Sequence, residues 1–303
     1  MTNFIPLLAP DFALIACGAL LCRHTALDRR VWEPVEALVY YFLFPVLLFQ
    51  AIISRPLDLG AMSGLMGAGV ALALTGIALA YSLPYWPIWG KTFDPRRHAA
   101  SAQVAFRFNS FIALALSQRL LGSEGLALVS VLVGVCVPIF NTAAVWPMAK
   151  HSGRGFGREL ARNPLIIGTL SGLLANLGGL SIPEWMAPTL ERIGQSSLPL
   201  GLMAAGAGMR LASLAQAKRL ATAVLFIKHA SLPLAAWAMG SLFGLNTSEQ
   251  TVLLLFSAVP TASSCYVLAT RMGYDGPYVA SLVTVSTALA ALSLPMALAL
   301  AGV

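Results

Sequence analysis

Charged residues are scarce in this sequence. Only 10% of the 303 residues are Asp, Glu, Lys or Arg, whereas 58% are hydrophobic, and the mean hydropathy is +0.78. Apolar stretches of about 20 residues match the thickness of a bilayer, which excludes a water-soluble domain and predicts an integral protein surrounded by lipid. The net charge is +7. Because basic residues of membrane proteins collect in cytoplasmic loops, this excess predicts no nucleic-acid partner.

Cysteine is equally sparse, and the sequence shows no metal-binding or catalytic motif. Cys17, Cys22, Cys136 and Cys265 lie in apolar stretches without CxxC or His-paired spacing, so we expect no disulfide, metal site or cofactor. No paired carboxylates, His-rich run or nucleophile–base motif indicates an intramembrane enzyme. The start of the chain lacks the basic region of a signal peptide, so its apolar segment is expected to stay as a helix.

Apolar runs between polar loops predict an all-α fold of ten transmembrane helices. The segments are 5–22, 35–54, 60–84, 99–121, 125–148, 164–181, 188–209, 220–243, 250–271 and 277–301. The longest connector, His151 to Asn163, is too short for a soluble domain. Any function is therefore expected to lie within the membrane.

Basic residues predict the orientation, since fourteen of the 19 fall in odd-numbered loops. They are Arg23, Arg29, Arg30, Lys91, Arg96, Arg97, Lys150, Arg154, Arg158, Arg162, Arg210, Lys218, Arg219 and Arg271. The even loops hold only Arg55, Arg119 and Arg192. Odd loops are thus predicted to be cytoplasmic, with both termini on the outer, periplasmic side of the inner membrane.

The two halves of the chain share a pattern of prolines. Pro10, Pro34 and Pro45 recur 154 residues later as Pro164, Pro188 and Pro199. Five segments per copy is an odd number, so the second copy must enter the membrane from the opposite side. We therefore predict two inverted five-helix repeats, 1–149 and 164–303, joined by a short cytoplasmic connector at 150–163.

The fourth and ninth segments align at an offset of 151 residues, which places Asn109 opposite Pro260. Proline removes a backbone donor, and the following run supplies hydroxyls, so this position is either an ordinary kink or a broken helix lining a polar cavity. Discontinuous helices of this kind form substrate sites in transporters. Residues of the two breaks are therefore candidates for substrate binding: Asn109, Ser110, Pro260, Thr261, Ser263 and Ser264.

Basic side chains in the middle of predicted transmembrane segments favour binding of an anion inside the protein. Arg107 either faces a wet cavity or extends to the cytoplasmic interface. Lys228 and His229 lie within the eighth segment, as candidates for electrostatic coupling or for packing. Asn141 either lines the cavity or bonds a neighbouring helix, and Glu36, near a segment end, is expected to be solvated at the interface.

Glycines in the seventh segment, Gly201, Gly206 and Gly208, permit a close approach of helices.

Five motifs, in order, resemble the auxin efflux carrier family, whose bacterial members include transporters proposed for malonate and malate. They are YYFLFPVLLFQAI, FRFNSFIALAL, NPLIIGTLSGLL, SSLPLGLMAAGAGM and VPTASSCYVLATRMGYDG. The resemblance implies ten helices in two inverted repeats with broken, crossing fourth and ninth helices. The chain departs from the family at Ala113 and Ala115, where members often have Gly and Pro.

By the same resemblance, helices one, two, six and seven form a scaffold, and the others form a transport domain that moves as an elevator. Asn109 would bind a substrate carboxylate, the Thr261 to Ser264 stretch would form the opposing surface, and Gln50 and Asn141 would line the pocket. A homodimer is also implied.

These observations predict a secondary transporter of small organic anions, either mono- or dicarboxylates, coupled to H⁺ or Na⁺. A bile-acid-type sodium symporter is the nearest alternative. A membrane sensor or binding subunit without transport activity is another, although the sequence shows no signalling module for it.

Overall fold

A computed structural model describes residues 5–53, 63–152, 164–208, 217–262 and 264–302. Within these ranges every regular element is helical, and each of the ten predicted apolar segments coincides with helical elements. The elements of the first half are α1 (Ile5–His24), α2 (Arg29–Leu38), η1 (Val39–Leu43), α3 (Phe44–Ile53), α4 (Ser63–Ser82), η2 (Leu83–Tyr85), η3 (Gly90–Thr92), α5 (Pro95–Phe106) and α6 (Ser110–Ser152).

The second half contains α8 (Pro164–Leu177), α9 (Ala187–Ala207), α10 (Lys218–Phe226), η5 (Ile227–Ser231), α11 (Leu232–Leu242), α12 (Thr247–Ala258), α13 (Ser264–Arg271) and α14 (Gly276–Leu300). The long α6 is interrupted at Gly122, whose φ of 61° and ψ of −141° lie outside helical geometry. Because a side chain disfavours that conformation, glycine separates the predicted fourth and fifth segments at this point.

Among the described residues, five continuous helical stretches are long and apolar enough to cross a membrane. They are Arg29–Gln50, Ser63–Tyr85, Leu128–Ala149, Lys218–Leu242 and Gly276–Leu300. Shorter apolar helices, Ala13–His24 and Ile112–Gly122, accompany them. The chain is therefore a multi-pass helical membrane protein, and the arrangement of ten spans in inverted repeats stays a prediction.

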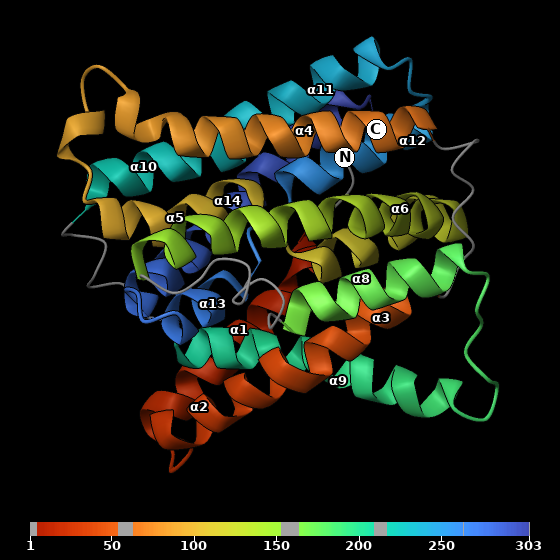
Figure 1. Cartoon of the computed structure of the whole chain (residues 1–303), viewed down its shortest axis with the longest axis horizontal. Helices are drawn as coiled ribbons and strands as arrows, with labels where there is room; N and C mark the ends of the chain where they lie inside the picture. The colour runs from red at the N-terminus through yellow and green to blue at the C-terminus, as the bar shows by residue number, and fades with distance from the viewer. Residues whose placement is uncertain (1–4, 54–62, 153–163, 209–216, 263, 303) are drawn as a thin grey trace.

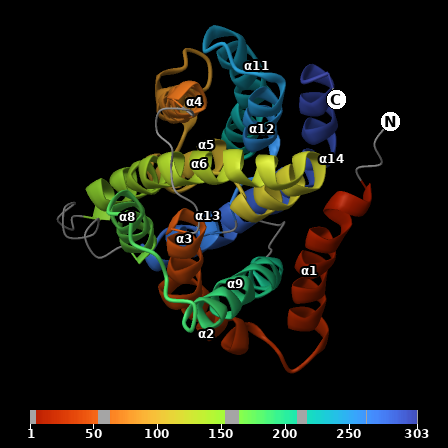
Figure 2. The same cartoon turned by 90° about the vertical axis from the view of Figure 1, so that its right-hand side faces the viewer.

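The helices pack in two groups (Figures 1 and 2). Helix group I consists of α1, α2, α3, α8 and α9, and helix group II consists of α4, α5, α6 and α10 to α14. The large apolar core lies mainly in group II, whereas group I has a small cluster of Trp32, Ala204 and Ala207. The family resemblance implies the same grouping of helices, and the roles of the two groups as scaffold and transport domain stay a prediction.

Helices α1 and α9 of group I touch backbone to backbone. A methyl group added to Gly18 would collide with the carbonyl of Met203, and one added to Gly206 would collide with the carbonyl of Ile15. Gly201 has room for a side chain. The predicted close approach is thus confirmed at Gly206.

Two helices of group II are interrupted where they meet. The chain is extended at Arg107, between α5 and α6, and at Val259, between α12 and α13. The Asn109 N–H donates to the Pro260 carbonyl at 2.8 Å, which joins the two breaks directly. The predicted breaks are therefore confirmed. The break at Asn109 forms without the family's Gly and Pro because the Asn109 side chain accepts from the Ile112 N–H at 3.2 Å and caps α6.

Candidate functional site

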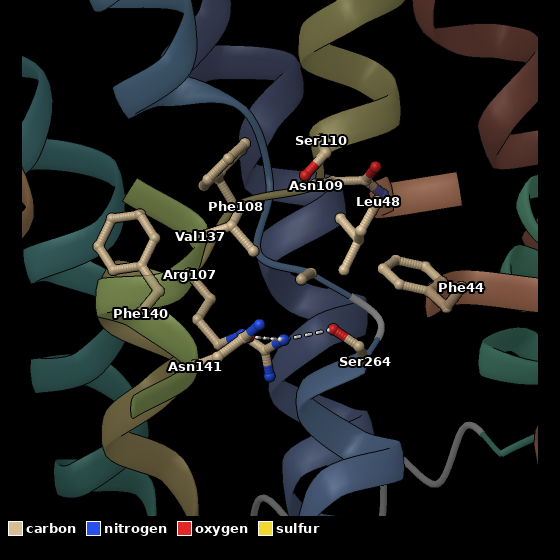
Figure 3. Close-up of a pocket in the computed structure, with 11 residues that line it drawn as sticks. Phe44, Leu48, Arg107, Phe108, Asn109, Ser110, Val137, Phe140, Asn141 and Ser264 are labelled. Carbon is tan, nitrogen blue, oxygen red and sulfur yellow. Dashed lines mark hydrogen bonds between the residues drawn. The ribbon is translucent and has the colours of Figure 1, made fainter. Parts of the chain in front are cut away.

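A pocket lies beside the crossing of the two breaks (Figure 3). It contains about 420 Å³ of empty space, part of which is open to the outside. Its walls come from four sources: Phe44 and Leu48 of α3, the break and start of α6, the part of α6 beyond Gly122, and the break and start of α13. The lining residues are Phe44, Leu48, Arg107, Phe108, Asn109, Ser110, Val137, Phe140, Asn141, Ala262 and Ser264.

Arg107 is the cation of this pocket. Its guanidinium donates to Gln103 Oε1 at 2.9 Å, to Asn141 Oδ1 at 3.1 Å and to Ser264 Oγ at 2.8 Å (Figure 3). The residue is 5% exposed, and no ion pair involves it in the part of the chain that the structure describes. Arg107 therefore faces the pocket rather than the interface, and its positive charge is held by neutral partners only.

Asn141 carries a second donor. Its Oδ1 accepts from Arg107, which fixes the orientation of the amide, and its Nδ2 has no hydrogen-bond partner among the described residues. Asn141 is only 2% exposed. A buried amide donor without a partner is costly, so such a group in a pocket wall indicates a place for a ligand acceptor.

The N-terminal ends of two helices add partial positive charge to the pocket. Helix α6 begins at Ser110 and α13 begins at Ser264, and both residues line the pocket. The N-terminus of a helix favours anions because its first N–H groups lack partners within the helix. Together with Arg107 and Asn141, the end of α13 makes one side of the pocket suited to an anionic group, whereas the start of α6 at Ser110 lies on the opposite side (Figure 3).

The rest of the pocket lining is apolar and consists of aromatic and aliphatic side chains. Phe108 and Phe140 line the pocket, and their rings pack with Phe256 and Phe106 behind them, at centroid distances of 3.9 Å and 5.7 Å. Leu48 and Phe44 approach from group I. A ligand would thus meet the donors of Arg107, Asn141 and Ser264 at one end of the pocket and apolar side chains along its walls (Figure 3).

Other residues predicted to bind substrate do not line the pocket or lie outside the described residues. The Thr261 N–H donates to Ser286 Oγ at 3.0 Å, so Thr261 supports the break and does not line the pocket. Ser263 lies outside the described residues. Gln50 lies against the backbone of α9 at Leu190 and Glu191, away from the pocket.

Lys228 lies behind the break of the ninth segment. Its ammonium donates to the Ser257 carbonyl at 3.0 Å, and the residue is 1% exposed. This carbonyl belongs to the last turn of α12, where the partial charge of a helix is negative. Lys228 thus neutralises the C-terminal end of α12, while the N-terminal end of α13 stays open to the pocket.

His229 connects the two sides of the same break. Its Nδ1 contacts Ser293 Oγ at 2.9 Å and its Nε2 contacts Ser286 Oγ at 2.8 Å. Ser293 donates to the Ala258 carbonyl, and Ser286 accepts from the Thr261 N–H. His229 therefore links both ends of the interruption and lies outside the pocket lining.

Some of these contacts are absent from the sequence-based prediction. Gln103 precedes Arg107 by four residues, a helical spacing that could have indicated their bond. The expectation of a solvated Glu36 is wrong: this carboxylate is 4% exposed and accepts from Arg29 and Tyr266. Its partner Tyr266 is 230 residues away, and no local pattern indicates such a pairing.

Comparisons with known proteins agree with a transporter. The profile of the family described as "Membrane transport protein" matches residues 147–298. The uncharacterized transporters named YfdV from Escherichia coli K12, Escherichia coli O157:H7 and Shigella flexneri are each 23% identical over 286 residues, covering 89% of both proteins. Since the profile spans half of the chain, this protein belongs to the membrane transport protein family, that of the auxin efflux carriers.

Proposed function

We propose that the protein is a secondary transporter of small organic anions, with mono- or dicarboxylates as the substrate class. The observation that carries this proposal is the buried Arg107 beside the partnerless Asn141 Nδ2, at the crossing of two interrupted helices. A carboxylate can accept from both groups at once, and charge-assisted hydrogen bonds of this kind are stronger than neutral ones.

Within this class, we propose a preference for a monocarboxylate with a compact apolar tail. The pocket has one cation, and Phe44, Leu48, Val137 and Phe140 make most of the rest of its lining apolar. A second carboxylate would lose its hydration against these side chains without gaining an ionic partner. A malonate-like dicarboxylate therefore has less support from this pocket than a monocarboxylate of similar length.

The proposed mechanism is alternating access of the elevator type. In support of it, the pocket lies on the border of the two helix groups, with Phe44 and Leu48 from group I and the ion-binding side from group II. Movement of group II along group I would carry the anion with the residues that bind it. We also propose an inner-membrane location, outward-facing termini and a homodimer, following the basic loops and the family resemblance.

For coupling, we propose a proton rather than sodium. Backbone carbonyls at the ends of broken helices often coordinate Na⁺ in transporters. Here the Lys228 ammonium already occupies such a carbonyl, that of Ser257. A sodium ion would have to displace this amino group from the carbonyl. A flux that depends on sodium would instead favour the bile-acid-type symporter as the better description.

The test compares binding and transport of two acids with equal carbon number, pentanoate and glutarate. Purified protein is expected to gain thermal stability from pentanoate, because specific binding stabilises the native state. Proteoliposomes are expected to take up labelled pentanoate. Asn141→Leu keeps the branching of the side chain but removes the free donor, together with the acceptor of Arg107. It should weaken binding by about tenfold or more, the effect of losing a hydrogen bond to a charged group.

The matched control is Thr142→Val, the next residue of α6, which does not line the pocket. It should bind and transport as the parent protein does. Equal pentanoate binding by the parent and Asn141→Leu proteins would show that the anion site lies elsewhere. Binding without any flux across the membrane would favour the sensor or binding subunit.

A further inference from the structure

A second cavity lies next to the pocket, on the side of the first residues of α2. It contains about 320 Å³ of empty space, part of which is open to the outside, and is lined by Glu36, Val39, Tyr40, Phe44, Gly201, Ala204, Ser264 and Val267. Phe44 and Ser264 line both cavities and so form the partition between them. The second cavity lies in the seam between α2 and α9 of group I and α13 of group II.

Glu36, which lines this cavity, belongs to a polar cluster with the half-buried Arg29 and the buried Tyr266. Arg29 Nη1 donates to Glu36 Oε1 at 2.8 Å, and Arg29 Nη2 donates to the Tyr266 hydroxyl at 2.7 Å. The Tyr266 hydroxyl is 2.8 and 2.9 Å from the two Glu36 oxygens. Arg29 and Glu36 lie on α2 and Tyr266 on α13, so the cluster joins the two helix groups.

The Tyr266 ring is also held sterically. A methyl group added to Gly208, at the end of α9, would lie 2.9 Å from the Tyr266 Cζ. The Arg29 guanidinium carbon is 5.9 Å from the ring centroid. Tyr266 is 3% exposed, so its ring fills the seam between α2 and α9.

We propose that Glu36, Arg29 and Tyr266 form a gate that closes the substrate path on the Arg29 side of the molecule. This inference rests on the proposed transport function, because alternating access requires α13 to move relative to α2. The path would lead from Arg107 past Ser264 into the second cavity, and would open when the Tyr266 hydroxyl leaves Glu36.

The chemistry of the cluster suits a reversible gate. The ion pair of Arg29 and Glu36 lies entirely on α2, so it stays intact when α13 moves away. Only the neutral hydroxyl of Tyr266 changes partners. Opening therefore leaves no unpaired charge buried in the seam, a situation that is strongly unfavourable elsewhere. The closed state still gains hydrogen bonds to charged groups, which are stronger than neutral ones.

The test measures access to the second cavity without any substrate. Val267→Cys places a thiol in the cavity wall, in a background where the accessible Cys17 and Cys22 are replaced by serine. The protein is held in nanodiscs, which leave both faces open to a charged thiol reagent. Adding Tyr266→Phe should speed the labelling of Cys at 267 by about tenfold, as expected for the loss of hydrogen bonds to a charged group.

Two controls make the result specific. Tyr274→Phe removes a hydroxyl that bonds the Met148 carbonyl within group II, and should leave the labelling rate unchanged. A thiol at Leu253, fully buried inside group II, reports general loosening. Faster labelling at 267 alone supports the gate. An unchanged rate at 267, or an equal increase at 253, overturns it. Since no substrate is used, the absence of carboxylate transport would be a separate result.

Discussion

The imidazole of His229 is part of a series of hydrogen bonds that runs from the Thr261 N–H to the Ala258 carbonyl. These two end groups fix the donor and the acceptor of each bond. The Thr261 N–H can only donate, so Ser286 Oγ accepts from it and is free to donate to Nε2. The Ala258 carbonyl can only accept, so Ser293 donates to it and accepts from Nδ1–H. A neutral imidazole with its proton on Nδ1 satisfies every member. We therefore assign His229 a positioning role that holds both sides of the break.

Ser286→Ala tests this series of hydrogen bonds. The substitution removes the acceptor of the buried Thr261 N–H and the donor to the half-buried His229. We expect a loss of about 1–3 kcal/mol in stability, the usual cost of leaving a buried polar group without a partner. The measurement is the thermal midpoint of the purified protein.

Thr284→Ala is the matched control on the same helix, because its hydroxyl only bonds the Ala280 carbonyl one turn earlier. That variant should keep nearly the parent midpoint. Equal thermal midpoints for the parent, Ser286→Ala and Thr284→Ala proteins would contradict the proposed series of hydrogen bonds through His229.

At the scale of helices, contact between α1 and α9 depends on two glycines that face one another's helix backbone, Gly18 and Gly206. Gly206→Ala should destabilise the protein by about 1–3 kcal/mol, since the added methyl meets backbone that cannot rotate away. Gly201→Ala, on the same helix, has its nearest neighbour at 3.6 Å and should be neutral or stabilising. Thermal midpoints of both variants check this, and similar losses for the two would contradict it.

The sequence predicts interruptions of helices better than it predicts their partners. Proline at 260 removes a backbone donor from its own helix, which is a local effect, and the repeat alignment then points to Asn109. Gln50 and Glu36 show the limit. Apolar composition predicts that their helices lie in the membrane, but not how each helix is rotated about its axis. That rotation depends on packing between distant segments, as in the contact of Gln50 with α9.

At the scale of the whole molecule, the basic residues lie toward one end. The starts of α5 and α10, which carry Arg96, Arg97, Lys218 and Arg219, lie side by side at the left of Figure 1. The turn between α11 and α12, at the opposite end, contains no basic residue. Positive residues stay on the cytoplasmic side during insertion, so this asymmetry predicts that the left end of the molecule in Figure 1 faces the cytoplasm.

Reporter fusions in a bacterial host test this orientation. Alkaline phosphatase is active only outside the inner membrane, so a fusion after α14 should be active, and one placed at Lys91, between α4 and α5, should be inactive. Fusions of a green fluorescent protein at the same positions should give the opposite pattern. Replacing Arg96 and Arg97 by glutamine weakens the charge bias of that loop and should reduce the contrast. Arg192→Gln, near the start of α9 and close to a loop predicted to be external, should leave the contrast unchanged. Phosphatase activity at Lys91 with none after α14 would reverse the assigned orientation, and would move the proposed gate at Glu36 from the cytoplasmic to the outer face.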